Sequence, residues 1–327
     1  MNILITGGAG FIGSHLAEEL LERKHYVCAM DNLSTGGLSN IEHLREHPRF
    51  SFSPGSVLDE FLMRELIDKS DMIYHLAAAV GVKYIMENPL KSMEVNIRGT
   101  EIVLELASVK KQPVLIASTS EVYGKNGQVP YKETSDRLMG ATMMHRWSYA
   151  CTKALDEFLG LAYWREKQLP VVIPRFFNTC GVRQTGQYGM VVPRFVQYAL
   201  TGEPLIVYGD GTQSRCFTDV SDAVSALVLL MESPDAAGEV FNIGSTQEIT
   251  IRELAEKVIQ LTNSSSPIRH IPYEEAYGAG FEDMKRRIPD ITKVKQCVGW
   301  EPKVSIDELL LKVMDYYQNG RNSESKV

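Results

Sequence analysis

The sequence predicts an α/β protein built on a doubly wound parallel sheet, with a smaller α/β portion toward the C-terminus. Short apolar segments alternate along the chain with segments of helical spacing, the pattern of parallel strands joined by helices. A glycine-rich turn joins the first of these strands to the first helix. The 327 residues suffice for one large domain that carries a smaller one. Ligands of such sheets bind beyond the carboxyl ends of the strands, so the residues that follow each strand are the candidates for a site.

The first strand and the first helix frame a turn suited to a dinucleotide. Residues 2–8 read NILITGG, and helical spacing of apolar residues begins at residue 11. Between them, Gly7, Gly10 and Gly13 form Gly-x-x-Gly-x-x-Gly, and Gly8 completes the overlapping Gly-x-Gly-x-x-Gly. Glycine permits a tight turn and a close approach of the backbone to a pyrophosphate, while the helix N-terminus presents free N–H groups to it.

The second strand, at residues 26–30, ends at an acidic residue. Asp31 follows Gly13 by eighteen residues, where its carboxylate can accept hydrogen bonds from both ribose hydroxyls. The same carboxylate repels a 2′-phosphate, so NAD is favoured over NADP. Asp31 could instead only cap the turn before NLSTGG, but the order of strand, turn, helix, strand and acid favours the dinucleotide.

Four further strands are expected at 72–78, 114–118, 171–176 and 239–244. They complete a Rossmann-type sheet, and the NAD-binding domain is predicted at 1–175, with a strand and a helix returning at about 205–245. Interleaved with it, residues 176–317 form a mainly substrate-binding portion. Polar residues 318–327 are expected to be a flexible tail.

A tyrosine and a lysine share one face of the helix predicted over 146–167. Tyr149 and Lys153 are four residues apart, so their side chains are neighbours. A lysine ammonium and the positive nicotinamide of NAD would favour the phenolate, and Thr119, after the strand at 114–118, could hold a substrate hydroxyl while Tyr149 removes its proton. An ordinary surface pair is the alternative, and the glycine turn, Asp31 and Thr119 argue against it.

Several motifs resemble the extended short-chain dehydrogenase/reductase family that modifies nucleotide sugars. The resemblance runs from residue 1 to about 317. The motifs that carry it are TGGAGFIG, HLAA, VNIRGT (95–100), STSEVYG, YACTK, RFFNTCG (175–181), VYGDG (207–211) and SRCFTDVSD (214–222).

The resemblance implies tightly bound NAD, a nucleoside diphosphate sugar under the C-terminal portion, and oxidation of that sugar at C4 by Thr119, Tyr149 and Lys153. The residues it implies for the cofactor are Gly7, Gly10, Phe11, Ile12, Gly13, Asp31, Asn32, Val57, Leu76, Ala77, Ala78, Asn96, Tyr149 and Lys153. Those it implies for the sugar nucleotide are Lys83, Thr119, Arg146, Asn178, Val192, Arg194, Tyr208, Arg215 and Arg287.

A 4-keto sugar can be epimerised, dehydrated or decarboxylated, and Ser120 and Glu121, which follow Thr119, bear on which reaction is predicted. A 4-epimerase needs only Thr119 and Tyr149 and has no task for Glu121. A 4,6-dehydratase can use Glu121 as the base at C5 but also needs an acid at C6, for which Ser120 is too weak. A decarboxylase could use Ser120 to bind the carboxylate or water, and Glu121 in proton delivery to C5.

A substrate carboxylate beside Glu121 requires nearby cations. Arg146, Arg286 and Arg287 are the candidates. The segment 277–290, with RWSYACTK and TSEVYG, resembles UDP-glucuronate decarboxylases of the UDP-xylose and UDP-apiose synthase type. In that resemblance Glu121 is catalytic and Arg287 acts near the sugar carboxylate, although a role as a diphosphate clamp is an equal alternative.

Two loops, at 77–89 and 183–189, resemble those of sugar 4-epimerases instead. The prediction is therefore decarboxylation of a UDP-uronic acid such as UDP-glucuronate, with 4-epimerisation as the alternative and 4,6-dehydration third. A redox-sensing regulator that only binds NAD is disfavoured because Tyr149 and Lys153 are both present.

Composition limits the partners and the setting. A net charge of −7 argues against a nucleic-acid partner, and no apolar run is long enough to span a membrane. The start of the chain lacks the features of a signal peptide, so a cytoplasmic protein is expected. Five scattered cysteines suit a reducing compartment, and His75 is expected to be a packed strand-end residue, so no metal is predicted. The resemblance implies a homodimer formed by helices at about 92–109 and 148–166.

Overall fold

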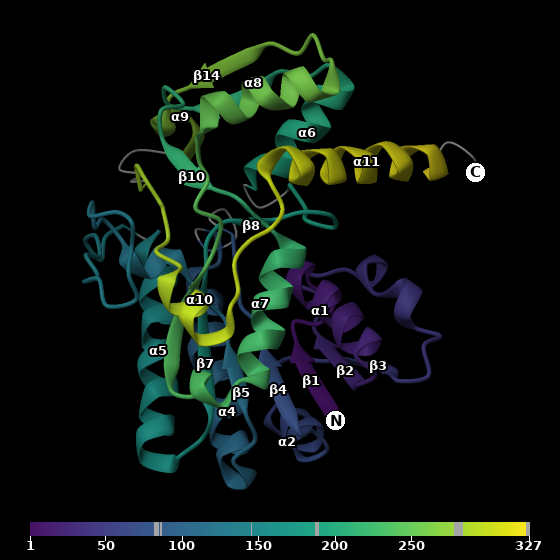
Figure 1. Ribbon diagram of the computed structural model, residues 1–327, viewed down its shortest axis with the longest axis vertical. Coiled ribbons are helices and arrows are strands. Elements are labelled where there is room, and N and C mark those ends of the chain that lie inside the picture. The colour runs from purple at the N-terminus through teal and green to yellow at the C-terminus, as the bar shows by residue number, and fades with distance from the viewer. Residues whose placement is uncertain (82–84, 86, 145, 187–189, 278–283, 325–327) are drawn as a thin grey trace.

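The computed structural model of the protein describes residues 1–81, 85, 87–144, 146–186, 190–277 and 284–324. A parallel sheet with helices on both faces forms the lower part of Figure 1, and a smaller α/β portion lies above it. The chain passes between the two portions more than once, so neither is a continuous segment.

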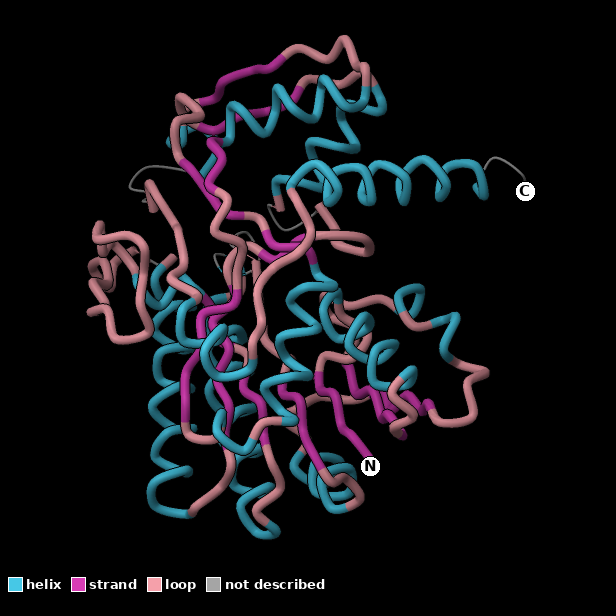
Figure 2. The backbone as a smooth tube through the Cα atoms, viewed as in Figure 1, coloured by secondary structure: helices cyan, strands magenta, loops and turns pink. Residues whose placement is uncertain are grey.

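The central sheet is parallel and doubly wound. Its strands are magenta in the lower half of Figure 2. Among the described residues they run in the order β12-β7-β5-β4-β1-β2-β3, with β6 paired to β7. Their bounds are β1 Asn2–Thr6, β2 Tyr26–Asp31, β3 Phe50–Pro54, β4 Met72–His75, β5 Val114–Ile116, β6 Ser118–Thr119, β7 Val171–Phe176 and β12 Glu239–Ile243. The strand order reverses between β1 and β4, and ligands of such sheets bind in the crevice at that point.

The predicted fold class is confirmed, and three details of the sheet differ from expectation. The strand at 72–78 ends at His75, and the segment at 114–118 is divided into β5 and β6. The edge strand β3 was not predicted, because FSFSP has no strong apolar pattern and no residue of it is fully buried.

Helices cover both faces of the sheet. The bounds are α1 Phe11–Glu22, α2 Glu60–Asp68, α4 Pro89–Lys110, α5 Trp147–Lys167 and α7 Val220–Glu232. Apolar residues of α1 and α7, such as Leu16 and Leu227, share one core with one face of the sheet, and residues of α2 and α4, such as Ile67 and Val103, share the core of the other face. Along α5, Gly160 lets the helix approach Ile116 and Val171.

The smaller portion has its own apolar core. It contains α6 Val191–Thr201, β9 Leu205–Tyr208, α8 Ile251–Thr262, β14 Ile268–Ile271, α9 Tyr273–Tyr277 and α11 Ile306–Glu324. Two short strand pairs, β8 Thr179–Cys180 with β11 Thr218–Asp219 and β10 Ser214–Cys216 with β13 Glu248–Thr250, connect it to the sheet domain. The last helix of the sheet domain is α10, Thr292–Val298, which packs back toward β12.

The strand and the helix predicted to return at about 205–245 correspond to β12 and α7, which rejoin the central sheet domain, whereas β9 pairs with β14 in the smaller portion. Helix α11 continues to Glu324 and so includes most of the predicted tail at 318–327. Packing of its first turns against α6 and α8 stabilises a helix that polar residues then prolong.

Candidate active site

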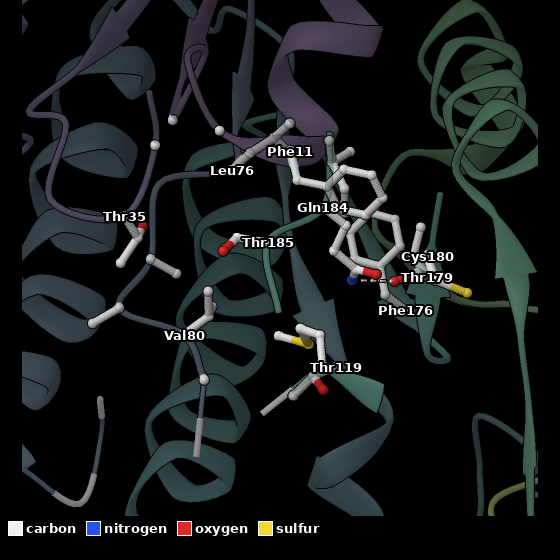
Figure 3. Close-up of a pocket in the computed structure, with 18 of the residues that line it drawn as sticks. Phe11, Thr35, Leu76, Val80, Thr119, Phe176, Thr179, Cys180, Gln184 and Thr185 are labelled. Atoms are coloured by element: carbon white, nitrogen blue, oxygen red, sulfur yellow. Dashed lines mark hydrogen bonds between the residues drawn. The ribbon is translucent and has the colours of Figure 1, made fainter. Parts of the chain in front are cut away.

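A cavity of about 980 Å³ lies beyond the carboxyl ends of the central strands. Figure 3 shows side chains from both portions around it, among them Phe11 and Thr119 from the sheet domain and Gln184 and Thr185 from the loop before α6. The predicted strand-end residues therefore do meet at one place.

The glycine turn leaves room at the N-terminus of α1. Gly7 adopts φ +73°, and its N–H donates to the Met30 carbonyl at 2.8 Å. Gly10 caps α1 without a side-chain hydrogen bond, so the first N–H groups of the helix remain available. A Cβ at Gly13 would lie 2.2 Å from the Gly7 carbonyl oxygen. A turn this tight fits the diphosphate of a dinucleotide.

We expect Gly13→Ala to disrupt this turn. The added methyl group overlaps the Gly7 backbone, so the free energy of unfolding should fall by about 1–3 kcal/mol. Displacement of the helix N-terminus should also weaken NAD binding by about tenfold or more, measured by titration of the protein with NAD. The control is Gly127→Ala, where an added Cβ meets no atom within 4 Å. Equal NAD affinity in the two variants would contradict the role of the turn.

Asp31 lies buried at the end of β2 and lines the cavity. Its Oδ2 accepts from the Ala9 N–H at 3.1 Å and its Oδ1 from the Leu33 N–H at 2.8 Å. Burial raises the pKa of this carboxyl, and backbone hydrogen bonds from Leu33, Ala9 and Gly10 oppose that rise. The backbone thus fixes the carboxylate in the cavity lining, where ribose hydroxyls could also donate to it.

The other residues predicted for the cofactor divide into two groups. Those lining the cavity are Gly7, Gly10, Phe11, Ile12, Gly13, Asn32, Val57, Leu76, Ala77 and Ala78. Asn96 is not among the lining residues: its Oδ1 accepts from the Ala79 N–H at 2.8 Å. It supports the loop after β4 from behind.

Thr119 and Tyr149 both line the cavity. Thr119 ends β6 and caps the short helix η3, Ser120–Tyr123, by accepting from the Glu121 N–H at 3.2 Å. Burial raises the pKa of Tyr149 above its ordinary value, and the carboxylates of Glu121 and Asp156 raise it further. The Thr119 hydroxyl lowers the pKa of the Tyr149 phenol. The sequence predicted that Lys153 would lower the pKa of this phenol, but burial and the two carboxylates determine the direction of its shift.

Lys153 lies behind the cavity wall. It is 2% exposed, and its ammonium donates to Asp156 Oδ2 at 2.7 Å. The sequence analysis identified no partner for this lysine, because nothing in YACTK indicates that Asp156 turns back toward it.

Two arginines flank Glu121. Arg287 Nη2 lies 3.6 Å and Arg146 Nη2 3.8 Å from Glu121 Oε1. Arg287 Nη1 also donates to Ser120 Oγ at 3.5 Å. Both arginines are buried and line the cavity, whereas Ser120 is fully buried and lies outside its lining. The three candidate cations are thus reduced to two, since Arg286 is exposed and pairs with Glu248 at 2.7 Å.

The far end of the cavity is lined by the smaller portion. Arg194 of α6 donates to the Tyr208 hydroxyl at 2.9 Å and lies over its ring at 4.9 Å. Arg215 donates to the Ser214 carbonyl at 2.8 Å. Arg194, Tyr208 and Arg215 all line the cavity, together with Asn178 and Val192. Lys83, the remaining residue predicted for the substrate, lies outside the described residues.

Several lining residues were missed by the sequence analysis. Gln213 donates to the Tyr208 carbonyl at 3.0 Å, and Tyr317 of α11 donates to the Gln184 carbonyl at 2.9 Å. Arg183, at the rim, donates to both oxygens of Glu18 at 3.0 and 2.6 Å. The contacts of Tyr317 and Arg183 join segments more than a hundred residues apart and leave no local pattern in the sequence.

A buried ionic network supports the strand end that carries Thr119. Arg175 of β7 donates through Nε and Nη2 to the two oxygens of Glu157, at 2.8 Å each. Glu157 also accepts from Ser118 Oγ at 2.5 Å. Because Glu157 belongs to α5 and Ser118 to β6, the network fixes the helix of Tyr149 against the strand of Thr119.

Among the described residues, His, Cys, Asp and Glu side chains form no group of three that could hold a metal ion. His75 is enclosed between Thr6 and Thr100, whose hydroxyls lie 2.8 and 3.2 Å from its ring nitrogens. Over the same residues, every helix is too short or too polar to cross a membrane.

Comparison with known proteins gives close relatives along the whole length. The chain is 47% identical over 320 residues to a UDP-N-acetyl-alpha-D-glucosaminuronate decarboxylase of Bacillus cytotoxicus, covering 98% of both proteins. It is 38% identical over 319 residues to UDP-glucuronic acid decarboxylase 1 of Arabidopsis thaliana, covering 98% of this chain and 70% of that protein.

A solved structure and a family description agree with these relatives. The structure of a UDP-glucuronic acid 4-epimerase from Bacillus cereus, in complex with UDP-glucuronic acid and NAD, superposes with a TM-score of 0.88 at 29% identity, over 98% of this chain and 99% of that one. The family described as GDP-mannose 4,6 dehydratase matches residues 4–313. The chain therefore belongs to this family of extended short-chain dehydrogenases/reductases, as its motifs had indicated.

Proposed function

We propose that the protein decarboxylates a UDP-uronic acid through a 4-keto intermediate, in a reaction that is redox-neutral and NAD-dependent. The observation that carries the proposal is the pair of buried guanidinium groups at the oxidation site. Arg287 and Arg146 lie 3.6 and 3.8 Å from the Glu121 carboxylate. One carboxylate, that of Glu121, neutralises only one of the two guanidinium charges. The remaining positive charge can bind the carboxylate of the sugar.

The residues at the other end of the cavity fit NAD. The glycine turn and the start of α1 would hold its diphosphate, and Asp31 its adenine-side ribose. When bound, NAD⁺ supplies the oxidant that takes hydride from C4 of the sugar and later returns it.

The chain's own residues then act in sequence. Thr119 holds the C4 hydroxyl, and Tyr149 removes its proton. The resulting ketone makes the C6 carboxylate part of a β-keto acid, so the bond from C5 to the carboxylate breaks, CO₂ leaves, and the electrons move to the C4 oxygen. Thr119 and the protonated Tyr149 stabilise that oxygen. Glu121 takes part in returning a proton to C5, and Tyr149 finally returns one to the C4 oxygen.

The relatives support the proposal and its alternative. Two named above are decarboxylases of UDP-linked uronic acids, one of them of a 2-acetamido uronate. The neighbour that binds UDP-glucuronic acid and NAD is a 4-epimerase. Epimerisation is therefore the second candidate, because it uses the same Thr119 and Tyr149 without Glu121.

Weighing the products separates these reactions. The purified protein would be incubated with UDP-glucuronate, UDP-N-acetylglucosaminuronate and UDP-glucose. We expect at least one uronate to lose CO₂ with no net accumulation of NADH. An unchanged mass with altered chromatographic retention would identify an epimerase, and loss of water from the hexose a dehydratase. The two uronates together also show whether a 2-acetamido group is accepted.

We further infer a homodimer formed through α4 and α5, which lie side by side in Figure 1. Apolar side chains on these helices are exposed, among them Phe158 at 65% and Leu90 at 79%. Sedimentation should give a dimer at micromolar concentration, and Phe158→Glu should weaken it. The control is Phe61→Glu on α2, also exposed at 82%, which should leave the dimer intact. A wild-type monomer would contradict the inference.

A further inference from the structure

The lysine of the catalytic helix is held by a carboxylate for which the proposed mechanism gives no task. Lys153 Nζ lies 2.7 Å from Asp156 Oδ2, and the two residues are 2% and 0% exposed. Tyr149, one helical turn earlier, lines the cavity, whereas Lys153 and Asp156 lie behind its wall. Lys153, the lysine that follows Tyr149 by one helical turn, is thus one partner of a buried ion pair.

Charged and polar groups of α5 and α4 act on Asp156. On its own helix, α5, it is influenced by Lys153 and by the like-charged Glu157, which is itself paired with Arg175. Burial raises the pKa of the Asp156 carboxyl, and Lys153 lowers it. From α4, Thr100 also lowers the pKa of the Asp156 carboxyl. Thr100 Oγ1 in turn lies 3.2 Å from Nε2 of His75 at the end of β4.

The charges that face the Tyr149 phenol come from several directions. Glu121 faces it from η3 and Asp156 from α5, and both carboxylates raise the pKa of the phenol after the larger effect of burial. Thr119 from β6 and Arg287 from the segment after α9 lower it. Each carboxylate therefore opposes the phenolate that the first step of the mechanism needs.

We infer that Asp156 is a positioning residue for sugar oxidation: its carboxylate, 2.7 Å from Lys153 Nζ, fixes this buried ammonium one helical turn after Tyr149 and places a negative charge behind the cavity wall. The inference rests on the proposed role of Tyr149 as the base. It concerns the oxidation step, which decarboxylation and epimerisation share, and so does not depend on which product is formed.

A purely structural role is the competing explanation. The ion pair of Asp156 and Lys153 could serve only as a tie within α5. Such a tie would affect thermal stability without altering the ionisation of Tyr149. The titration of the phenol therefore separates the two explanations.

The test uses the NAD-loaded protein without sugar. Phenolate formation is followed by ultraviolet absorbance against pH, and the same titration of Tyr149→Phe is subtracted to isolate this phenol. In Asp156→Asn the opposing charge is gone, so the phenolate should form at lower pH, with the midpoint reduced by about one pH unit. The acidic limb of kcat/KM for sugar turnover should move in the same direction.

Two further variants complete the test. Asp156→Ser is neutral and smaller, and it should give the same downward shift; it replaces Asp156→Asn if that protein does not fold. Asp156→Glu keeps the charge and should retain the wild-type midpoint. A folded neutral variant with an unmoved midpoint would overturn the inference. A shifted midpoint in a protein that decarboxylates neither uronate would refute the proposed product and leave the inference standing.

Discussion

Tyr149→Phe is expected to lower the rate of sugar oxidation by at least about 10³-fold. The phenol lines the cavity together with Thr119, so it is the group placed to take the C4 proton. Without that proton transfer no 4-keto sugar forms, and decarboxylation, epimerisation and dehydration all fail together. The measurement is transient NADH absorbance after mixing the protein with the uronate that it accepts.

The control for this variant is Tyr26→Phe, since Tyr26 lies on the surface at the start of β2 and is 56% exposed. It should oxidise the sugar at the wild-type rate. NAD affinity should be the same in both variants, because neither change touches the glycine turn. Near-normal oxidation by Tyr149→Phe would exclude this phenol as the base.

Glu121→Gln should separate oxidation from completion of the UDP-pentose. The glutamine cannot deliver a proton to C5 after CO₂ has left, so overall decarboxylation to the UDP-pentose should slow by about 10²-fold or more. Oxidation should persist, because removing the charge of Glu121 lowers the pKa of Tyr149 and so favours the base form. We therefore expect NADH and a 4-keto sugar to accumulate, which absorbance and mass measurements detect together.

The matched control is Glu46→Gln on the exposed surface after η2 (Glu42–Leu44), which should behave as wild type. Two results would count against the role of Glu121. Unimpaired decarboxylation would remove it from the mechanism. Loss of oxidation as well would indicate that Glu121 acts by organising Arg146 and Arg287, which lie 3.8 and 3.6 Å away, rather than by moving a proton.

The sequence predicted those parts of the molecule that local chemistry determines. The glycine turn can be recognised because Gly13 has no space for a side chain, and Tyr149 and Lys153 because helical spacing places them on one face. Strand ends such as Thr119 could be assigned to one site because parallel strands all point to the same edge of the sheet.

What the sequence did not predict depends on contacts between distant segments. The edge strand β3 has too little apolar pattern, and β9 pairs with β14 about sixty residues later. Charge alone made Arg286 and Arg287 both candidates, and the family resemblance singled out Arg287; the fold places Arg287 3.6 Å from Glu121 and pairs Arg286 with Glu248. Likewise, Asp156 pairs with Lys153 where both are buried on α5, a circumstance that no motif records.

The most direct test of the account follows hydrogen at C4 and C5 of the sugar. Each of the two UDP-uronic acids, labelled with deuterium at C4, would be incubated with the protein in D₂O and the product examined by NMR. We predict a UDP-pentose that has lost CO₂, keeps the label at C4 because the hydride returns to the same carbon, and gains one solvent deuterium at C5. A product that retains its carboxylate and takes no deuterium at C5, or one that loses the C4 label, would contradict decarboxylation through a 4-keto sugar.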